Sequence, residues 1–119
     1  MHNKTKTIFC DIDGTLLEHQ GDLSKTITNQ PRLLDGAITK IGEWDRKGYN
    51  IILVTGRRES MRKLTEQHLA SLGVFYDQLI MGIGGGPRIV INDKKPYSDD
   101  NTCYAINIER NKGIGEVEL

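Results

Sequence analysis

The sequence predicts an α/β fold in which a mostly parallel five-stranded sheet lies between layers of helices. Three observations support this prediction. Strand-type and helix-type segments alternate along the 119 residues, the strand-type segments are short and apolar like buried parallel strands, and a glycine follows each helical segment. A chain of this length is enough for one domain, so residues 1–119 are expected to form a single unit.

The first strand is expected at Thr7–Asp11, where an apolar run leads into a turn. The next stretch, Leu16–Arg32, has no clean period and contains several Gly, Asp, Asn and Pro residues. It is predicted to be a long loop or a small flap over the site. A helix is expected at Leu34–Lys47, because apolar residues recur there at three- and four-residue spacing and Gly48 lies just past the end.

The second half of the chain continues the alternation. A strand is expected at Asn50–Val54 and a helix at Glu59–Leu72, and three more strands follow at Gln78–Met81, Arg88–Ile91 and Cys103–Ile108. The tail Glu109–Leu119 gives no pattern that places it. A β-α-β-α-β order implies right-handed crossovers with helices on both faces of the sheet, a Rossmann-like three-layer sandwich without a large cap domain.

The composition excludes some functions and compartments. There are 16 basic and 16 acidic residues, so no net field draws the chain to nucleic acid or to a membrane. The amino terminus has no apolar leader and no apolar stretch reaches membrane length, which predicts a cytoplasmic protein. Cys10 and Cys103 both fall in predicted strands, as small buried residues in a reducing compartment do.

The most informative motif is Asp11-Ile12-Asp13-Gly14-Thr15, directly after the first apolar run. Two carboxylates one residue apart repel each other and raise each other's pKa, so a divalent cation or a chemical role must compensate. Mg²⁺ takes oxygen ligands and leaves room for a substrate phosphate. Asp11 is predicted to be the nucleophile or a metal ligand, and Asp13 the general acid and base. An ordinary turn after an edge strand is the alternative, and the buried run before the motif counts against it.

A second strand end with candidate functional residues is Thr55-Gly56-Arg57, which follows the aliphatic strand Asn50–Val54. In parallel sheets the site lies beyond the carboxyl ends of the strands, so this tripeptide should lie near the aspartates. A hydroxyl, a glycine and the first amides of a helix together form an anion site. We expect Arg57, rather than its neighbour Arg58, to contact phosphate. The alternative is that Thr55 only caps the helix.

A third strand end, Asn92-Asp93, offers oxygen ligands across the sheet from Asp11. The predicted metal ligands are therefore Asp11, Asp13, Asn92 and Asp93, with the choice between the last two left open. Asp93 could instead be a turn residue before Pro96.

With these residues assembled, the chain resembles the haloacid dehalogenase superfamily, which consists mostly of Mg²⁺-dependent phosphohydrolases with an aspartate nucleophile. Within it, the stretches Leu64–Leu69 and Tyr76–Gly82 resemble short, capless phosphatases linked to capsule and surface-polysaccharide synthesis. The run Val54–Ser60 also resembles the phosphatase half of polynucleotide kinase–phosphatases.

This resemblance implies a magnesium-dependent phosphomonoesterase acting on a small phosphorylated metabolite such as a sugar phosphate. Asp11 would attack phosphorus and become an aspartyl-phosphate, and Asp13 would protonate the leaving alcohol and then activate water. Thr55 would hold the phosphoryl oxygens. Mg²⁺ would bridge Asp11, the Asp13 carbonyl, the substrate and the end of the fourth strand.

The sequence departs from the superfamily where a Lys or Arg normally precedes the fourth strand. The stretch Gly82–Arg88 contains no lysine. At ~3.3 Å per residue Arg88 would begin about 13 Å before Asn92, too far from the strand end. Lys94 and Arg57 are better placed, and the backbone amides of Gly84–Gly86 are a further candidate.

Two other functions remain open at this point. A polynucleotide 3′-phosphatase is favoured by the basic group Arg57, Arg58, Arg62 and Lys63, whereas the neutral net charge and 6% aromatic content weigh against a nucleic-acid groove. A catalytically impaired relative with a binding or regulatory role is the other. A small phosphorylated molecule is the expected partner, no membrane is expected, and homo-oligomerisation is left open.

Overall fold

The computed structural model describes residues 5–119, apart from the side chain of Leu23. Its centre is a parallel sheet in the order β1-β2-β3, formed by β1 (Thr7–Asp11), β2 (Asn50–Val54) and β3 (Gln78–Ile80). Asp11 is in register with Val54, and Val54 with Ile80, so the three strands end level with one another. The edge predicted to carry the chemistry is therefore formed by three strand ends.

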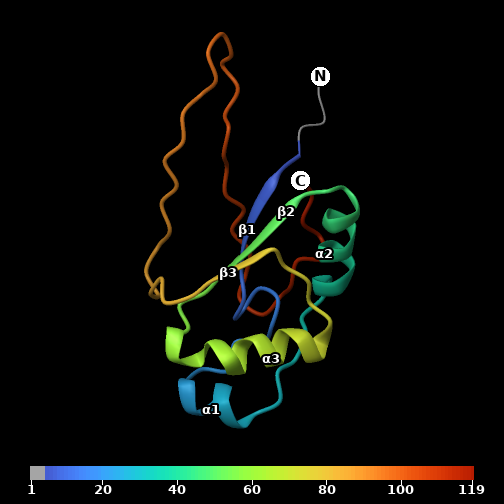
Figure 1. Ribbon diagram of the computed structural model, residues 1–119, viewed down its shortest axis with the longest axis vertical. Coiled ribbons are helices and arrows are strands. Elements are labelled where there is room, and N and C mark those ends of the chain that lie inside the picture. The colour runs from blue at the N-terminus through green and yellow to red at the C-terminus, as the bar shows by residue number, and fades with distance from the viewer. Residues whose placement is uncertain (1–4) are drawn as a thin grey trace.

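The described part of the chain also forms four helical segments, namely α1 (Leu23–Thr28), α2 (Ala37–Arg46), the 3₁₀ turn η1 (Glu59–Met61) and α3 (Arg62–Leu72). Figure 1 shows α2 beside the sheet, α3 across the end at which β1 finishes, and α1 beyond α3. The longest helix, α3, has 11 residues. Within residues 5–119, no helix has the length and apolar character of a membrane span.

The core is built from the inward faces of these elements. The residues of α2 that pack inward are spaced by three and four, as an amphipathic helix requires: Ala37, Lys40, Ile41 and Trp44. Ile51 and Leu53 on β2 are 1% and 0% exposed, and Ile12, in the turn after β1, is 0% exposed. Burial of Ile12 anchors the turn that carries the two aspartates.

As far as α3, the chain follows the sequence prediction with three differences. The helix expected at Leu34–Lys47 begins three residues later, and the helix expected at Glu59–Leu72 is divided into η1 and α3. The segment Leu16–Arg32 is not all loop. It contains α1, because the Asp22 side chain accepts a hydrogen bond from the Lys25 amide at 2.8 Å and so caps the helix.

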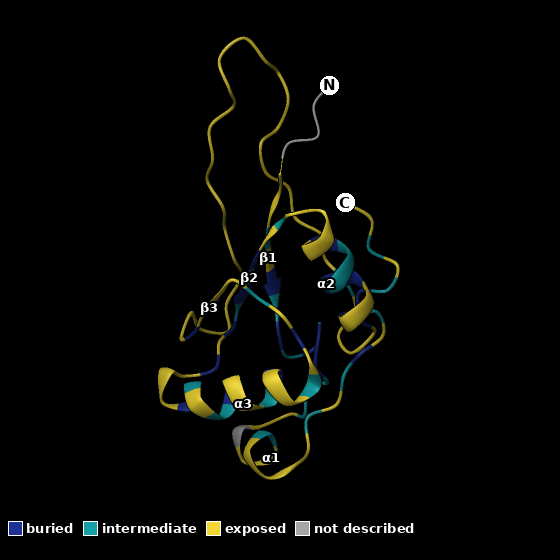
Figure 2. Ribbon diagram, turned by 45° about the vertical axis from the view of Figure 1, so that its right-hand side comes forward, coloured by how far each residue is buried: buried dark blue, intermediate teal, exposed yellow. Residues whose placement is uncertain are grey.

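The prediction of five strands is wrong for residues 5–119, in which three strands form. Residues 88–91 and 103–108 form no strand, and residues 83–107, called the arm below, extend outward from β3 and return (Figure 1). Every residue of the arm is exposed, with Ile89 and Ile91 at 84% and 92% (Figure 2). A strand needs a neighbour for its backbone groups, and within residues 5–119 no ladder pairs with these segments.

The two cysteines and the tail also find their places. Cys10 is buried as expected, whereas Cys103 lies in the arm and is exposed. The tail returns to the body of the molecule, where Ile114 is 3% exposed and its amide donates to the Asp35 carbonyl at 2.8 Å. A segment without sequence pattern thus contributes to the core.

Candidate functional site

The floor of the site is the turn that follows β1. The Ile12 carbonyl accepts hydrogen bonds from the amides of Thr15, Leu16 and Leu17 at 3.1, 2.9 and 3.0 Å. Gly14 has φ +92°, a left-handed conformation that glycine adopts without a Cβ clash. The backbone of this turn therefore determines where the Asp11 and Asp13 side chains project.

Asp11 is a partly buried carboxylate with incomplete compensation of its charge. Burial is the main cause that raises its pKa above the usual value, and the negative charge of Asp13 adds to it. A hydrogen bond from the Thr15 hydroxyl to Oδ2 at 3.1 Å and the charge of Arg88 act in the opposite direction. An ionised Asp11 is therefore a favourable place for a further positive charge.

Arg88 has a role that the sequence argument set aside. That argument assumed a strand at Arg88–Ile91, which would hold Arg88 about 13 Å from the strand end. Because this segment is not a strand, Arg88 is free of that constraint, and its guanidinium lowers the pKa of Asp11. Its Nη1 also donates to the Gly86 carbonyl at 2.6 Å. The positive charge of Arg88 therefore favours the ionised form of Asp11.

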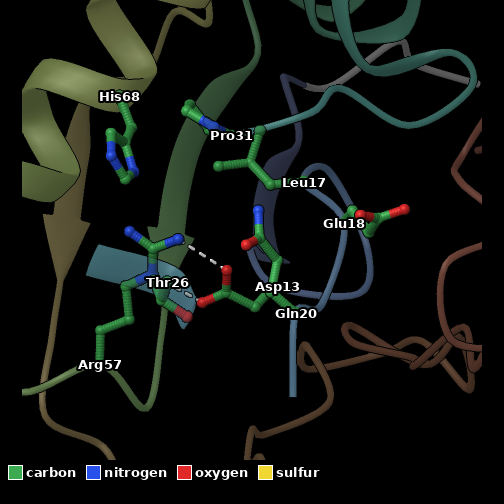
Figure 3. A pocket seen from close by; sticks show the side chains of 8 residues that line it. All are labelled: Asp13, Leu17, Glu18, Gln20, Thr26, Pro31, Arg57 and His68. Atoms are coloured by element: carbon green, nitrogen blue, oxygen red, sulfur yellow. Dashed lines mark hydrogen bonds and ion pairs between the residues drawn. The ribbon is translucent and has the colours of Figure 1, made fainter. Parts of the chain in front are cut away.

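Asp13 forms a two-point ion pair with Arg57 (Figure 3). Arg57 Nε donates to Asp13 Oδ2 and Nη2 donates to Oδ1, each at 2.7 Å. Arg57 is only 9% exposed, and its Nη1 donates to the hydroxyl of Thr65 at 3.0 Å. Arg57 thus lies in the site and Arg58 is exposed. The partners of Arg57 here are protein groups, so its contact with phosphate stays a prediction.

The Thr55-Gly56-Arg57 turn is fixed against the segment after β3. The Thr55 amide donates to the Ile80 carbonyl at 3.0 Å, and the Gly82 amide to the Arg57 carbonyl at 2.7 Å. A Cβ on Gly56 would lie 2.8 Å from the Gly84 carbonyl oxygen, so the close approach requires glycine.

Thr55 itself does not cap the following helix. It is 1% exposed, its hydroxyl oxygen accepts from the Arg57 amide at 3.0 Å, and the N-cap of η1 is Arg58. The Thr55 hydroxyl proton remains available to an acceptor such as a phosphoryl oxygen, which is the predicted role of this residue.

A hollow of about 260 Å³ opens beside the Asp13–Arg57 pair. One wall comes from the segment before and within α1 and the other from the turn after β2; the lining residues besides the pair are His19, Gln20, Gly21, Asp22, Thr26, Gly56, Arg58 and Met61. This space is large enough for a small organic group next to the general acid candidate.

A tighter gap between Gln20 and His68 adjoins the same pair (Figure 3) and has no room for a water molecule. Gln20 Oε1 and His68 Nδ1 are buried there without a hydrogen-bond partner. Burial is the main cause that lowers the pKa of His68; the charge of Arg57 adds to it and the charge of Asp13 acts in the opposite direction. The neutral imidazole is therefore favoured beside Arg57.

The remaining predicted site residues, Asn92, Asp93 and Lys94, lie in the arm and are exposed. Asn92 donates through Nδ2 to the Thr102 hydroxyl on the returning side of the arm at 2.7 Å. Across residues 5–119, no group of three or more His, Cys, Asp or Glu side chains is arranged to hold a metal ion. The structure does not bring Asn92 and Asp93 to Asp11, and their role as metal ligands stays a prediction.

Sequence reasoning missed two residues that shape the site. Thr65 contacts Arg57 from α3, and Asn111 in the tail holds the segment between β1 and α1. The side-chain Oδ1 of Asn111 accepts a hydrogen bond from the backbone N–H of His19 at 2.7 Å. The backbone N–H of Asn111 donates to the Gly14 carbonyl at 2.8 Å. No local pattern marks either residue, because their partners are distant in the sequence.

Most of the chain is similar to one described family. The family described as PITM 1-3, LNS2 domain matches residues 8–94, which include both aspartates and the Thr55 turn. No curated protein matches the chain.

Two solved assemblies contain similar chains. A chain of the Pnkp1/Rnl/Hen1 complex is 29% identical with a TM-score of 0.57, and it aligns over 82% of this chain and 31% of its own length. A chain of the Pnkp1/Rnl/Hen1 RNA repair complex is 30% identical with a TM-score of 0.57, over 82% of this chain and 29% of its own length. The chain thus spans less than a third of the solved chains that it matches.

These similarities support the predicted haloacid dehalogenase superfamily. They do not point to the capsule-linked phosphatases within it. The family match includes β1 with Asp11, the turn after it with Asp13, and the turn after β2 with Arg57. The chain belongs to the LNS2-domain family of PITM 1-3, and with it to the phosphatase-like domains of the haloacid dehalogenase superfamily.

Proposed function

We propose that this domain is a magnesium-dependent phosphomonoesterase that works through an aspartyl-phosphate on Asp11. The observation that supports it most is that Asp11 and Asp13 lie close together, at the end of β1 and in the turn after it, but have different surroundings. Asp11 is partly buried and has no salt bridge with any residue of 5–119, whereas Asp13 is held at both oxygens by Arg57. Two carboxylates in different environments suit two different roles.

In the proposed reaction, a carboxylate oxygen of Asp11 forms a bond to phosphorus as the bond from phosphorus to the ester oxygen breaks. A proton from Asp13 goes to the leaving oxygen. Water then attacks the phosphorus of the aspartyl-phosphate, Asp13 takes the proton of that water, and phosphate leaves Asp11. The proton that Asp13 gives to the leaving oxygen is the one that it took from water in the preceding turnover. Each Asp13 oxygen accepts one hydrogen bond from Arg57, which leaves a lone pair to carry that proton.

The residues present are suitable for Mg²⁺. One or two carboxylates with substrate phosphate and water satisfy this ion, and burial of an undercompensated Asp11 favours a cation there. Asp11 and the backbone carbonyl of Asp13 would hold it, with Asn92 or Asp93 as proposed further ligands. When bound, the ion would stabilise the negative charge that develops on the phosphoryl oxygens.

We propose a sugar phosphate or a similar small polar molecule as substrate, the class suggested by the resemblance to capsule-linked phosphatases. The hollow beside Asp13 measures about 260 Å³, and polar side chains such as Gln20, Asp22 and Thr26 line it. No Phe, Tyr or Trp is among its lining residues, so it offers no aromatic surface on which a base could stack.

A polynucleotide 3′-phosphate is the second candidate substrate. The similar chains in two Pnkp1/Rnl/Hen1 assemblies, one of them an RNA repair complex, favour it. The exposed Arg58 at the rim of the hollow could meet a neighbouring phosphodiester. Activity on a polynucleotide should fall steeply with added salt, whereas activity on a sugar phosphate should change little.

The test is phosphate release from sugar phosphates, nucleotides and 3′-phosphorylated oligonucleotides, with Mg²⁺ and with EDTA. Asp11→Asn serves as the blank, and Arg46→Met, at an exposed arginine of α2 outside the hollow, is the surface control that should retain activity. Release that requires Mg²⁺ and is lost in Asp11→Asn would support the proposal. No release from folded protein that binds Mg²⁺ would overturn it in favour of a binding or regulatory role.

A further inference from the structure

Arg57 is a buried cation whose orientation is set by two partners. It is 9% exposed, and a charge at this depth is strongly unfavourable unless its N–H groups are paired. Its Nε and Nη2 donate hydrogen bonds to the Asp13 carboxylate at 2.7 Å each, and its Nη1 donates to the Thr65 hydroxyl oxygen at 3.0 Å. Thr65 is thus the contact that fixes the end of the guanidinium turned away from Asp13.

Thr65 is well suited to hold a neighbouring group in place. It is 0% exposed in the first turn of α3, and its β-branched side chain has few rotamers in a helix. Leu69, one turn later, is also 0% exposed and anchors the helix in the core. A hydroxyl attached to such a rigid support gives Arg57 a fixed direction.

The planar guanidinium of Arg57 in turn fixes the orientation of the Asp13 carboxylate. A guanidinium is planar and binds a carboxylate through two parallel hydrogen bonds, so rotation of the fork must move both carboxylate oxygens. His68 faces the same guanidinium from α3 (Figure 3), but its buried Nδ1 has no hydrogen-bond partner among the described residues. Asp13 and the Thr65 hydroxyl are therefore the groups that hold Arg57.

Building on the proposed function, we propose that Thr65 is a positioning residue for the general acid and base. Its hydroxyl fixes Arg57, and Arg57 holds the Asp13 carboxylate at the angle at which it exchanges a proton with the leaving oxygen. Thr65 does not touch the substrate. Its removal should lower the rate of the chemical step while substrate binding is kept, because misplacement of a reacting group costs rate.

The kinetic test compares Thr65→Val, which keeps the shape but not the hydroxyl, with Thr65→Ser, which keeps the hydroxyl. Leu69→Val is the matched control, since it disturbs the same helix without touching a hydrogen bond. We expect kcat to fall about 10-fold in Thr65→Val with KM within about twofold, and kcat in Thr65→Ser and Leu69→Val to stay within about twofold of wild type. Equal kcat losses in the Val and Ser variants, or in Leu69→Val, would show a purely structural role and overturn the proposal.

A second measurement does not depend on activity. The Nε–H proton of Arg57, identified by loss of its signal in Arg57→Met, should exchange slowly with water in wild type and in Thr65→Ser, as seen by nitrogen-15 NMR. In Thr65→Val the signal should broaden, and an unchanged signal would overturn the positioning role. Inactive wild-type protein would instead contradict the proposed phosphatase, whereas active protein with an unaffected Thr65→Val variant would contradict only the role of Thr65.

Discussion

The body of the molecule and its arm differ in how far their residues are buried. The body buries both apolar and charged side chains, whereas the arm exposes both. In the body, Leu53 is 0% exposed and the charged Arg57 is 9% exposed with three paired nitrogens. In the arm, Ile91 is 92% exposed, and exposed Asn92 donates a hydrogen bond to Thr102 across the arm. The half of the site that rests on the body is therefore rigidly held, whereas the half predicted from the arm is not.

The largest difference should appear in the stability of two aliphatic truncations. Leu53→Ala should cost about 2–5 kcal/mol of the free energy of unfolding, because it leaves a cavity in the core. Ile91→Ala should stay within about 0.5 kcal/mol, because its side chain is already in water. Urea denaturation of both variants measures this. A loss above about 2 kcal/mol in Ile91→Ala would mean that the arm packs as a strand and that the comparison fails.

A smaller effect should separate two neighbouring arginines. Arg57→Met should destabilise the fold by about 2 kcal/mol, since it leaves the partly buried Asp13 without its partner. Arg58→Met changes an exposed side chain next to it and should stay within about 0.5 kcal/mol. Chemical denaturation at one pH and salt concentration is the measurement. Equal losses in the two variants would show that the Asp13–Arg57 pair contributes nothing specific.

Asn111 allows hydrogen bonding to be separated from backbone strain. Its φ is +65°, so Asn111→Ala loses the two side-chain hydrogen bonds with His19 and also strains the backbone. Asn111→Gly loses the same hydrogen bonds without the strain. We expect losses of about 2 and about 1 kcal/mol, measured by thermal unfolding. A neutral Asn111→Gly would indicate that the clamp on His19 is not important for stability.

The smallest effect concerns the two aspartates and should have opposite signs. The pKa of Asp11 is raised above its ordinary 3.8, chiefly by burial, so ionisation of Asp11 destabilises the fold. This part of the stability is present below pH 3.8 and is lost as the pH rises through the raised pKa. In EDTA at pH 7, Asp11→Asn should therefore raise Tm by about 2–4 °C.

Asp13→Asn is the matched control for that measurement. It removes the charge that pairs with buried Arg57, so Tm should fall at pH 7. The gain in Asp11→Asn should shrink toward pH 4, where wild-type Asp11 takes up its proton. A fall of Tm in both variants would contradict the undercompensated charge assigned to Asp11.

Much of the fold could be predicted from local pattern. The apolar runs predicted β1 and β2 at the bounds observed, and the three- and four-residue spacing predicted α2 and α3 to within a few residues. Parallel strands end at one edge, so the sequence also placed Asp13 and Arg57 together, and the structure joins them. The arm was mispredicted because an apolar run such as Ile89–Ile91 becomes a strand only where a neighbour accepts its hydrogen bonds.

The sequence by itself determined the residue types and the edge at which they meet, because helical periodicity and strand ends are local properties. Only the tertiary structure decided which groups pair there. Asp13 meets Arg57 across 44 positions and His19 meets Asn111 across 92. Thr65 became a partner of Arg57 because α3 packs against the turn after β2. Such contacts depend on how buried elements pack, and packing is a property of the whole chain.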